Sequence, residues 1–212
     1  MNQVGNVGLI AALAFAVYGI VAGAVGGKLR SPRMLKSAER VTLAFFVMIT
    51  VSVIALEYLI LTDDFHNAYV AGHSNRALPT YYKVAVLWAG QEGSLLFWTW
   101  ILAGYGGLAV LLNRAKNRQL MPYVIAMLSV TSAFFAAITF FAANPFGELS
   151  MMTAGGAQPF AAPDGKGLNP LLQYHSMVIH PPMLYLGYVG FVVPFAFAMA
   201  ALITRQLGDN WI

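Results

Sequence analysis

The sequence predicts an all-α fold, a polytopic bundle of about five transmembrane helices. Of the 212 residues, 59% are hydrophobic and 9% are charged, whereas soluble domains carry roughly 25% charged residues. The mean hydropathy is +0.68. Five apolar stretches each approach the roughly 20 residues that a helix needs to cross a hydrocarbon core. We therefore expect residues 1–212 to form a single membrane domain.

The five predicted spans alternate with polar segments. The first begins within "MNQVGNVGLI", which lacks the basic stretch of a secretory signal, so we expect this span to be retained. Trp211 is expected to be an interfacial anchor or the beginning of a further element. The predicted spans cover about residues 4–27, 41–61, 94–113, 121–142 and 181–203.

Basic residues indicate the orientation of the bundle. Most Lys and Arg lie on one side of it, which the positive-inside rule makes cytoplasmic. The N-terminus and segments 62–93 and 143–180 are then outside, and the C-terminus is cytoplasmic. Because all four histidines lie in these outer segments, we expect any chemistry on the outer face. The basic residues of the cytoplasmic side are Lys28, Arg30, Arg33, Lys36, Arg40, Arg114, Lys116, Arg118 and Arg205.

Composition excludes several classes of chemistry and partner. The chain has no cysteine, so it forms no disulfide, zinc–thiolate site or thiol nucleophile of its own. Its formal charge of +4 does not indicate nucleic acid, because basic residues of a membrane chain mostly report topology. Membrane lipid is the partner that composition alone predicts.

The stretch "WAGQEGSLLFW", residues 88–98, marks the beginning of the third span. We expect Ser94 to cap a helix that begins at Leu95, with Trp98 and Trp100 in its first two turns. The tryptophans have two interpretations. They are anchors at the headgroup level, or they form a flat apolar shelf beside two glycines that let the backbone approach a large planar ligand.

The stretch "NPLLQYHSMVIHPPMLYLGYVGF", residues 169–191, marks the beginning of the last span. Pro181 disfavours helical dihedrals at His180, and proline suits a first helical turn, so we expect the helix to begin at or just after His180. A neutral imidazole there is a candidate metal ligand. Its alternative role is a cap or an interfacial hydrogen-bonding group. His175 lies five residues earlier, off the i, i+4 spacing of one helix face, and is the weaker candidate.

Three other ionisable residues have less specific interpretations. We expect His66 and His73 to lie in a solvated loop, with "DDFH" forming a turn. Glu57 is the only acidic residue within a predicted span, so it is either functional or reaches the interface. One candidate function is a transporter or ion-translocating subunit. Such proteins carry ionisable groups in several spans, so a single acidic residue argues against this function. A non-catalytic assembly scaffold is another candidate.

Two long motifs identify a resemblance. The segments "YVAGHSNRALPTYYKVAVLWAGQEGSLLFWTWIL" and "LNPLLQYHSMVIHPPMLYLGYVGF" closely resemble the amino-terminal portion of the CcmF family. These are cytochrome c biogenesis proteins, the haem lyase subunits of the haem-handling WWD-domain superfamily. The resemblance covers essentially the whole chain. It implies that the protein is a fragment or split subunit, because the family's remaining haem-ligating histidines belong to later spans.

The resemblance also implies site residues. The tryptophan-rich outer segment, here about residues 80–100, forms the family's haem platform. The histidine of the His-Pro-Pro motif, in the outer loop at about 143–182, is an axial ligand of the haem iron and corresponds to His180. Family members often have histidine at the position of Gln91. The platform residues correspond to Trp88, Gly90, Glu92, Gly93, Ser94, Trp98 and Trp100.

The implied function is haem handling during cytochrome c maturation. The cofactor is haem b (iron protoporphyrin IX), held on the outer face of the bacterial inner membrane for thioether attachment to the Cys-X-X-Cys-His motif of apocytochrome c. The substrate supplies both sulfurs, in agreement with the absence of cysteine here. The implied partners are a haem chaperone, apocytochrome c and membrane-bound thiol-handling subunits. We assign Arg76 and Lys83 to haem propionates or a partner, with ordinary interfacial residues as the alternative.

Overall fold

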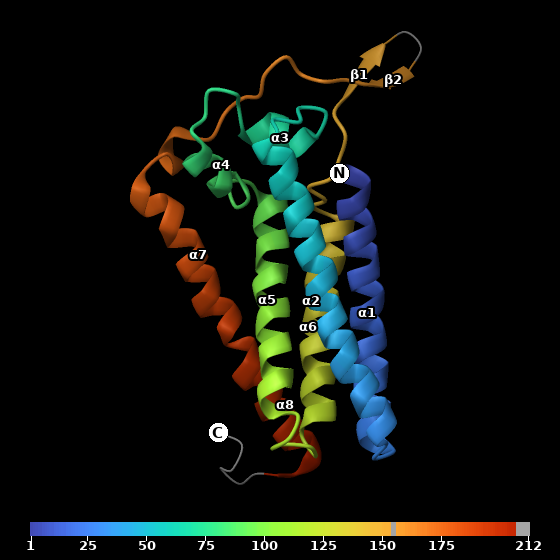
Figure 1. Cartoon of the computed structure of the whole chain (residues 1–212). Coiled ribbons are helices and arrows are strands. Elements are labelled where there is room, and N and C mark those ends of the chain that lie inside the picture. The colour runs from blue at the N-terminus through green and yellow to red at the C-terminus, as the bar shows by residue number, and fades with distance from the viewer. Residues whose placement is uncertain (154–155, 207–212) are drawn as a thin grey trace.

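The computed structural model describes residues 1–153 and 156–206, so Trp211 lies outside the described residues. Within them, five helical segments are long and apolar enough to cross a membrane. Figure 1 shows these segments side by side as an elongated bundle, with the short helices and the hairpin gathered at one end. The predicted all-α bundle is confirmed, with one small hairpin added.

The elements follow the predicted order. The first four spans are single helices, whereas the fifth, His175–Thr204, consists of two consecutive helices that meet at Phe191. Strands β1 (Ser150–Thr153) and β2 (Gly156–Pro159) pair antiparallel, and η1 (Pro170–Leu172) is one turn of 3-10 helix. The helices are α1 (Asn2–Lys28), α2 (Pro32–Leu61), α3 (Ala68–His73), α4 (Thr80–Val86), α5 (Gln91–Asn113), α6 (Met121–Phe141), α7 (His175–Gly190) and α8 (Val192–Thr204).

The second span begins earlier than predicted. Helix α2 starts at Pro32 rather than near residue 41, because Ser31 caps it and accepts a hydrogen bond from the Met34 N–H at 3.5 Å. Proline at the first helical position has its dihedrals preset for a helix. Arg33, Lys36 and Arg40, which hydropathy assigned to a loop, therefore lie on the first turns of α2, whereas Lys28 ends α1 and Arg30 lies in the turn between the two helices.

The third span also begins earlier, at Gln91 rather than Leu95. Gly90 is its N-cap residue and has an extended backbone conformation. The negative charge of Glu92 in the first turn interacts favourably with the helix dipole and stabilises this beginning. The prediction that Ser94 caps the helix is therefore wrong. The Ser94 hydroxyl instead donates to the Trp88 carbonyl at 3.1 Å. This bond links the first turn of α5 to the loop that precedes it.

The last span begins at His175, so the prediction that it begins at His180 is wrong. Pro181 and Pro182 lie inside α7. Transmembrane helices tolerate internal proline because other groups can satisfy the backbone carbonyls that it leaves without a donor. His180 consequently lies on the side of a helix rather than at its mouth.

Helix α1 packs closely against α2 and α6 through small residues. A Cβ at Gly19 would lie 2.5 Å from the Ser129 Oγ, and one at Gly23 would lie 2.6 Å from the Pro122 carbonyl oxygen. The Ser52 hydroxyl of α2 donates to the Gly5 carbonyl at 2.9 Å. Such small-residue contacts let helix backbones approach within a membrane.

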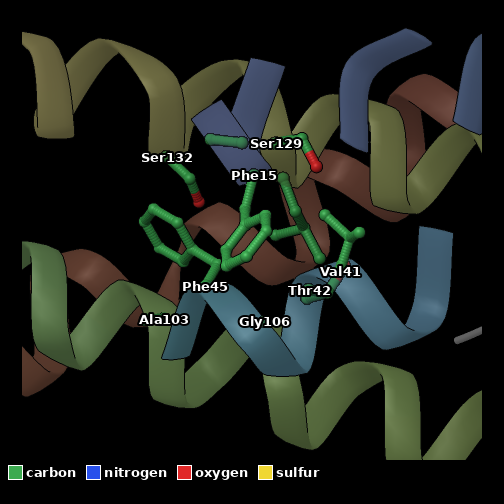
Figure 2. Close-up of a pocket in the computed structure, with 10 residues that line it drawn as sticks. Phe15, Val41, Thr42, Phe45, Ala103, Gly106, Ser129 and Ser132 are labelled. Atoms are coloured by element: carbon green, nitrogen blue, oxygen red, sulfur yellow. The ribbon is translucent and has the colours of Figure 1, made fainter. Parts of the chain in front are cut away.

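The centre of the bundle is nearly solid. Figure 2 shows side chains of α1, α2, α5 and α6 around a cavity of about 10 Å³, lined in part by Phe15, Phe45, Ser129 and Ser132. This is about the space of one water molecule. This cavity is too small to hold a planar cofactor.

The two ends of the bundle differ in structure. The loop-rich end carries the N-terminus, α3, α4, the hairpin and the beginning of α7 (Figure 1). The basic end carries the α1–α2 turn, the α5–α6 turn and the end of α8. The candidate haem residues belong to the loop-rich end and the adjacent turns of α5 and α7.

Candidate functional site

The tryptophan segment, residues 87–100, is built around Phe97. The ring centroid of Phe97 lies 5.3 Å from that of Trp88, 5.9 Å from Trp100 and 6.0 Å from Tyr185 of α7. Phe97 is only 7% exposed. The aromatic rings therefore already pack against one another, and a ligand can use only what they leave exposed.

Trp98 and Trp100 lie on different sides of α5. Two residues along a helix turn the side chain by about 200°. Trp98 packs against Phe135 of α6 at 5.7 Å and Tyr185 of α7 at 5.2 Å. Trp100 faces α2, where its indole N–H donates to the Thr50 hydroxyl at 3.0 Å. The two rings do not form one flat surface.

Tyr69 of α3 joins the two ends of the loop before α5. Its hydroxyl donates to the Val86 carbonyl at 2.7 Å and accepts from the Gly90 N–H at 3.1 Å. The side chain is buried, and this burial raises the pKa of Tyr69 above its usual value. The hydroxyl therefore stays protonated and remains a donor at physiological pH.

The two glycines of the segment pack against protein. A Cβ at Gly90 would lie 2.5 Å from His73 Nε2 and 2.9 Å from the Tyr69 ring, and one at Gly93 would overlap the Leu87 carbonyl oxygen and the Tyr69 hydroxyl. Glycine is therefore required at both positions by close approach. The space beside them is filled by α3 and the preceding loop.

His73 differs from the expectation of a solvated loop. It is the last residue of α3, lies half-buried beneath Gly90, and stacks on Tyr69 with ring centroids 4.4 Å apart. Its Nδ1 lies 2.9 Å from the Tyr69 carbonyl oxygen. The short helix places residues i and i+4 on one face. His66, in contrast, is exposed and contacts Asp64 at 3.0 Å, as the turn prediction requires.

The two candidate basic residues have different surroundings. Lys83 is 7% exposed, and its ammonium lies 2.6 Å from both carboxylate oxygens of Asp63. Arg76 is exposed, with its guanidinium 5.5 Å from the centre of the Phe65 ring. Its backbone N–H donates to Asp164, and this bond is the main cause that lowers the pKa of that carboxyl. Arg76 thus presents a cation at the surface, whereas the charge of Lys83 is neutralised.

His180 is exposed on the side of α7 that faces away from α5. Val178, Tyr185 and Val189 lie on the opposite side and contact the bundle, and two residues from Val178 to His180 turn the helix by about 200°. A Cβ at Gly187, seven residues further and on nearly the same face, would meet no atom of the described residues within 4 Å. The structure does not bring His180 and the tryptophans into one cavity.

His175, the first residue of α7, contacts α4. Its Nδ1 lies 3.1 Å from the Tyr81 hydroxyl, and the two rings stack with centroids 5.5 Å apart. The Tyr82 hydroxyl donates to the Gln173 carbonyl at 2.7 Å. His175 therefore ties α7 to α4, the helix that precedes the tryptophan segment. Across the described ranges, no three His, Cys, Asp or Glu residues are grouped to hold a metal ion.

Glu57 lies on α2 with both carboxyl oxygens buried and, within residues 1–153 and 156–206, without a hydrogen-bond partner. It is seven residues from Thr50 and thus on the same face, about 10 Å nearer the loop-rich end. Because Thr50 contacts Trp100 and the helices run antiparallel, Glu57 faces α5 near Gly93. The structure shows it turned into the bundle rather than reaching the interface.

Sequence reasoning missed the residues that support the segment. Tyr69 and His73 had a usable signal, the i, i+4 spacing within a short helix. Asp63 also had one, since a lysine among apolar residues needs an acidic partner. Phe97 and Tyr185 had none, because their contact joins helices that are far apart in the sequence.

Comparisons with known proteins support the assignment to a family. A sequence model of the family described as Cytochrome C assembly protein matches residues 88–211. The chain is 34% identical over 209 residues to the cytochrome c-type biogenesis protein CcmF of Haemophilus influenzae, covering 99% of this chain and 31% of that protein. For CcmF of Pseudomonas aeruginosa the identity is 37% over 209 residues, with the same coverages.

Two further comparisons agree. The cytochrome c-type biogenesis protein NrfE of Haemophilus influenzae is 38% identical over 178 residues, covering 84% of this chain and 26% of that protein. The solved structure of a protein named Cytochrome c Heme Lyase CcmF superimposes with a TM-score of 0.78 at 28% identity, covering 99% of this chain and 31% of that one. The chain spans about 31% of the length of the CcmF relatives. By sequence and by fold, this chain belongs to the cytochrome c assembly protein family.

Proposed function

We propose that this chain is the part of a cytochrome c maturation protein that holds haem at the loop-rich end, with His180 as an axial ligand of the haem iron. The supporting observation is an exposed imidazole on an open and largely apolar face of α7. A buried or hydrogen-bonded histidine would suit packing instead. The similar solved structure described above is that of a protein named as a haem lyase.

The surroundings of His180 fit a haem bound on an open face. Met183 and Leu184 lie one turn away and are exposed, and Gly187 leaves open space two turns away. A porphyrin is planar and mostly apolar, so it can lie along such a face while the imidazole reaches its iron. The porphyrin supplies four ligands itself, which removes the need for a cluster of metal-binding side chains.

The tryptophan segment supports this site in two ways. Trp88 and Trp98 are half-exposed, and Trp98 packs against the side of α7 opposite His180. The two rings therefore supply stacking surface only to the part of a haem that reaches past α7, and such aromatic contacts contribute about 0.5–1.5 kcal/mol each beyond burial. The remaining residues hold the segment in place. This second group is Gly90, Glu92, Gly93, Ser94 and Trp100.

Arg76 is the better of the two candidates for a haem propionate. Its guanidinium is exposed, and in the described part of the chain no carboxylate lies within 4 Å of it. Lys83 already contacts both oxygens of Asp63. A guanidinium also presents paired N–H donors that match a carboxylate.

The reaction that this arrangement serves is thioether formation between haem b and apocytochrome c. Each cysteine thiol of a Cys-X-X-Cys-His motif adds across one haem vinyl group, the sulfur bonding to carbon and the proton completing the other carbon. The chain itself binds and orients, and a complete lyase requires further family regions. Its partners are a haem chaperone, apocytochrome c and membrane-bound thiol-handling subunits, on the outer face of the bacterial inner membrane.

Ion translocation is the second candidate, favoured by the buried carboxyl of Glu57, which has no hydrogen-bond partner among the residues that the structure describes. A pathway normally needs ionisable groups in several spans. Replacing Glu57 with Gln distinguishes the two functions. It is expected to leave haem content unchanged if the chain handles haem.

The visible absorption spectrum tests the proposal. Three proteins are purified from haem-producing cells: the chain with its natural sequence, the His180→Ala variant and the His66→Ala variant. Both histidines are exposed at the loop-rich half of the molecule, so they are matched for accessibility. We expect the Soret band to fall strongly in His180→Ala alone. Equal losses in both variants, or no band in the natural sequence, would contradict the proposal.

A further inference from the structure

The basic end of the bundle contains a cavity that haem handling does not use. It has a volume of about 850 Å³, within the range of about 300–1,000 Å³ typical of small-molecule sites. The cavity lies where the α1–α2 turn, the α5–α6 turn and the end of α8 meet. It is therefore at the opposite end of the bundle from the tryptophan segment.

The cavity combines a cationic rim with an apolar wall. The rim residues are exposed, and across residues 1–153 and 156–206 none of their charged groups lies within 4 Å of a carboxylate. Leu35, Pro122 and the ring of Tyr123 supply the wall, and Glu39 is the acidic residue of the lining. The cationic residues of the rim are Arg30, Lys36, Arg114 and Arg118.

Arg30 occupies a position where glycine is the usual residue. The α1 helix ends in a Schellman motif, in which the Arg30 N–H donates to Gly27 at 3.2 Å and the Ser31 N–H donates to Gly26 at 3.0 Å. Arg30 has φ of +49°, a left-handed conformation that is costly for any residue with a Cβ. Because Ser31 also caps α2, the turn is short and holds Arg30 at the rim.

We propose that this cavity binds the headgroup of an anionic glycerophospholipid. The basic rim matches a phosphodiester, and the apolar wall matches the glycerol and the first acyl carbons. Basic pockets between transmembrane helices commonly bind such headgroups. A soluble phosphate compound would match the rim but leave the wall unused, and it would not be concentrated at the ends of membrane-spanning helices.

The test compares how different lipids stabilise the purified 212-residue chain in detergent. The measurement is the thermal unfolding midpoint during titration with dioleoylphosphatidylglycerol, with dioleoylphosphatidylcholine of identical acyl chains, or with inorganic phosphate. We expect phosphatidylglycerol to raise the midpoint and native mass spectrometry to show one retained lipid. An equal rise with phosphatidylcholine would contradict headgroup selection. A rise with inorganic phosphate that equals that with phosphatidylglycerol would contradict a lipid site.

Variants distinguish the cavity from general surface charge. Arg30→Gly removes a cation while keeping the left-handed turn, so it does not threaten folding. Combined with Arg118→Gln, it is expected to weaken the affinity for phosphatidylglycerol about tenfold. The matched control, Arg33→Gln with Lys116→Gln, removes two exposed cations that do not line the cavity. Equal losses in both double variants would overturn the proposal, and the haem spectrum is an independent measurement.

Discussion

The tryptophan segment and α7 carry the two halves of the proposed haem site, and they are held in opposite ways. In and around the segment, its own glycines and interlocking aromatic rings, the buried Tyr69 of α3 and the Lys83–Asp63 ion pair beneath α4 leave little space or unused hydrogen-bonding capacity. Helix α7 is largely exposed, and within the described residues its buried positions are Val178 and Val189. The tryptophan segment is therefore a rigid support, whereas α7 is the loosely packed helix that carries His180, the candidate iron ligand.

This contrast indicates how the two regions divide their roles. A preformed aromatic surface orders a planar ligand at low entropic cost. An exposed histidine on a lightly packed helix remains free to meet iron and a second ligand from elsewhere. Substitutions should therefore destabilise the fold when placed in the segment, and change haem content without destabilisation when placed on α7.

The largest expected loss of stability follows from breaking the ion pair beneath α4. Lys83→Met leaves Asp63 partly buried without its partner, which costs about 2–4 kcal/mol after allowance for the residual exposure of the carboxylate. The double variant Lys83→Met with Asp63→Asn should recover most of this loss, because asparagine removes the unpaired charge and tolerates the left-handed conformation of residue 63, whose φ is +54°. Thermal unfolding in detergent measures both. A single variant as stable as the natural chain would mean that the pair does not hold α4.

A pair of glycine substitutions compares the two regions directly. Gly93→Ala forces a methyl group against the Leu87 carbonyl and the Tyr69 hydroxyl, so overpacking should cost about 1–3 kcal/mol. Gly187→Ala places the same methyl group in open space on α7, and alanine favours a helix by about 0.5–1 kcal/mol. The same unfolding measurement should therefore give changes of opposite sign. Equal destabilisation would contradict the contrast.

Tyr69→Phe should cost about 1–3 kcal/mol, because the Val86 carbonyl and the Gly90 N–H lose their shared buried partner. Hydrogen exchange at Gly90 should become faster in the variant. Tyr82→Phe is the control, since it removes a more exposed hydroxyl that bonds one carbonyl. Unchanged exchange at Gly90 would show that the loop is held by other contacts.

The raised pKa of Tyr69 predicts an alkaline loss of stability. The folded state binds the phenolic proton more tightly than the unfolded state, so the contribution is fully present below the unfolded pKa of about 10 and is lost as pH rises above it. Unfolding midpoints between about pH 8 and 11 should fall less steeply in Tyr69→Phe than in the natural chain. Parallel curves would rule out Tyr69 as the titrating group.

The smallest expected effect on stability is that of His180→Ala, within about 0.5 kcal/mol, because the imidazole is exposed. His73→Ala is its matched contrast and should cost more, since it removes a ring stacked on Tyr69 beneath Gly90. A clear destabilisation by His180→Ala in the haem-free chain would show that this histidine has a packing role.

Hydropathy predicted the number and order of the spans because burial in lipid is a property of each segment alone. Helix beginnings were less predictable. Helix α2 begins at Pro32, capped by Ser31, although charged residues follow in its first turns. Helix α7 continues through Pro181 instead of beginning there. The divergence of Trp98 and Trp100 follows from helical geometry and was available from spacing. The Trp98–Tyr185 contact was not, because it depends on how distant helices pack.

Pro181 and Pro182 also affect the mechanics of α7. Neither proline has an N–H, so neither can donate to the carbonyl four residues earlier, that of Met177 or Val178. The turn that carries His180 therefore lacks two of the bonds that normally couple successive turns. Bending at this point costs less than elsewhere in the helix, so the imidazole can adjust its tilt while Tyr185 and Val189 keep the lower part of α7 seated on the bundle.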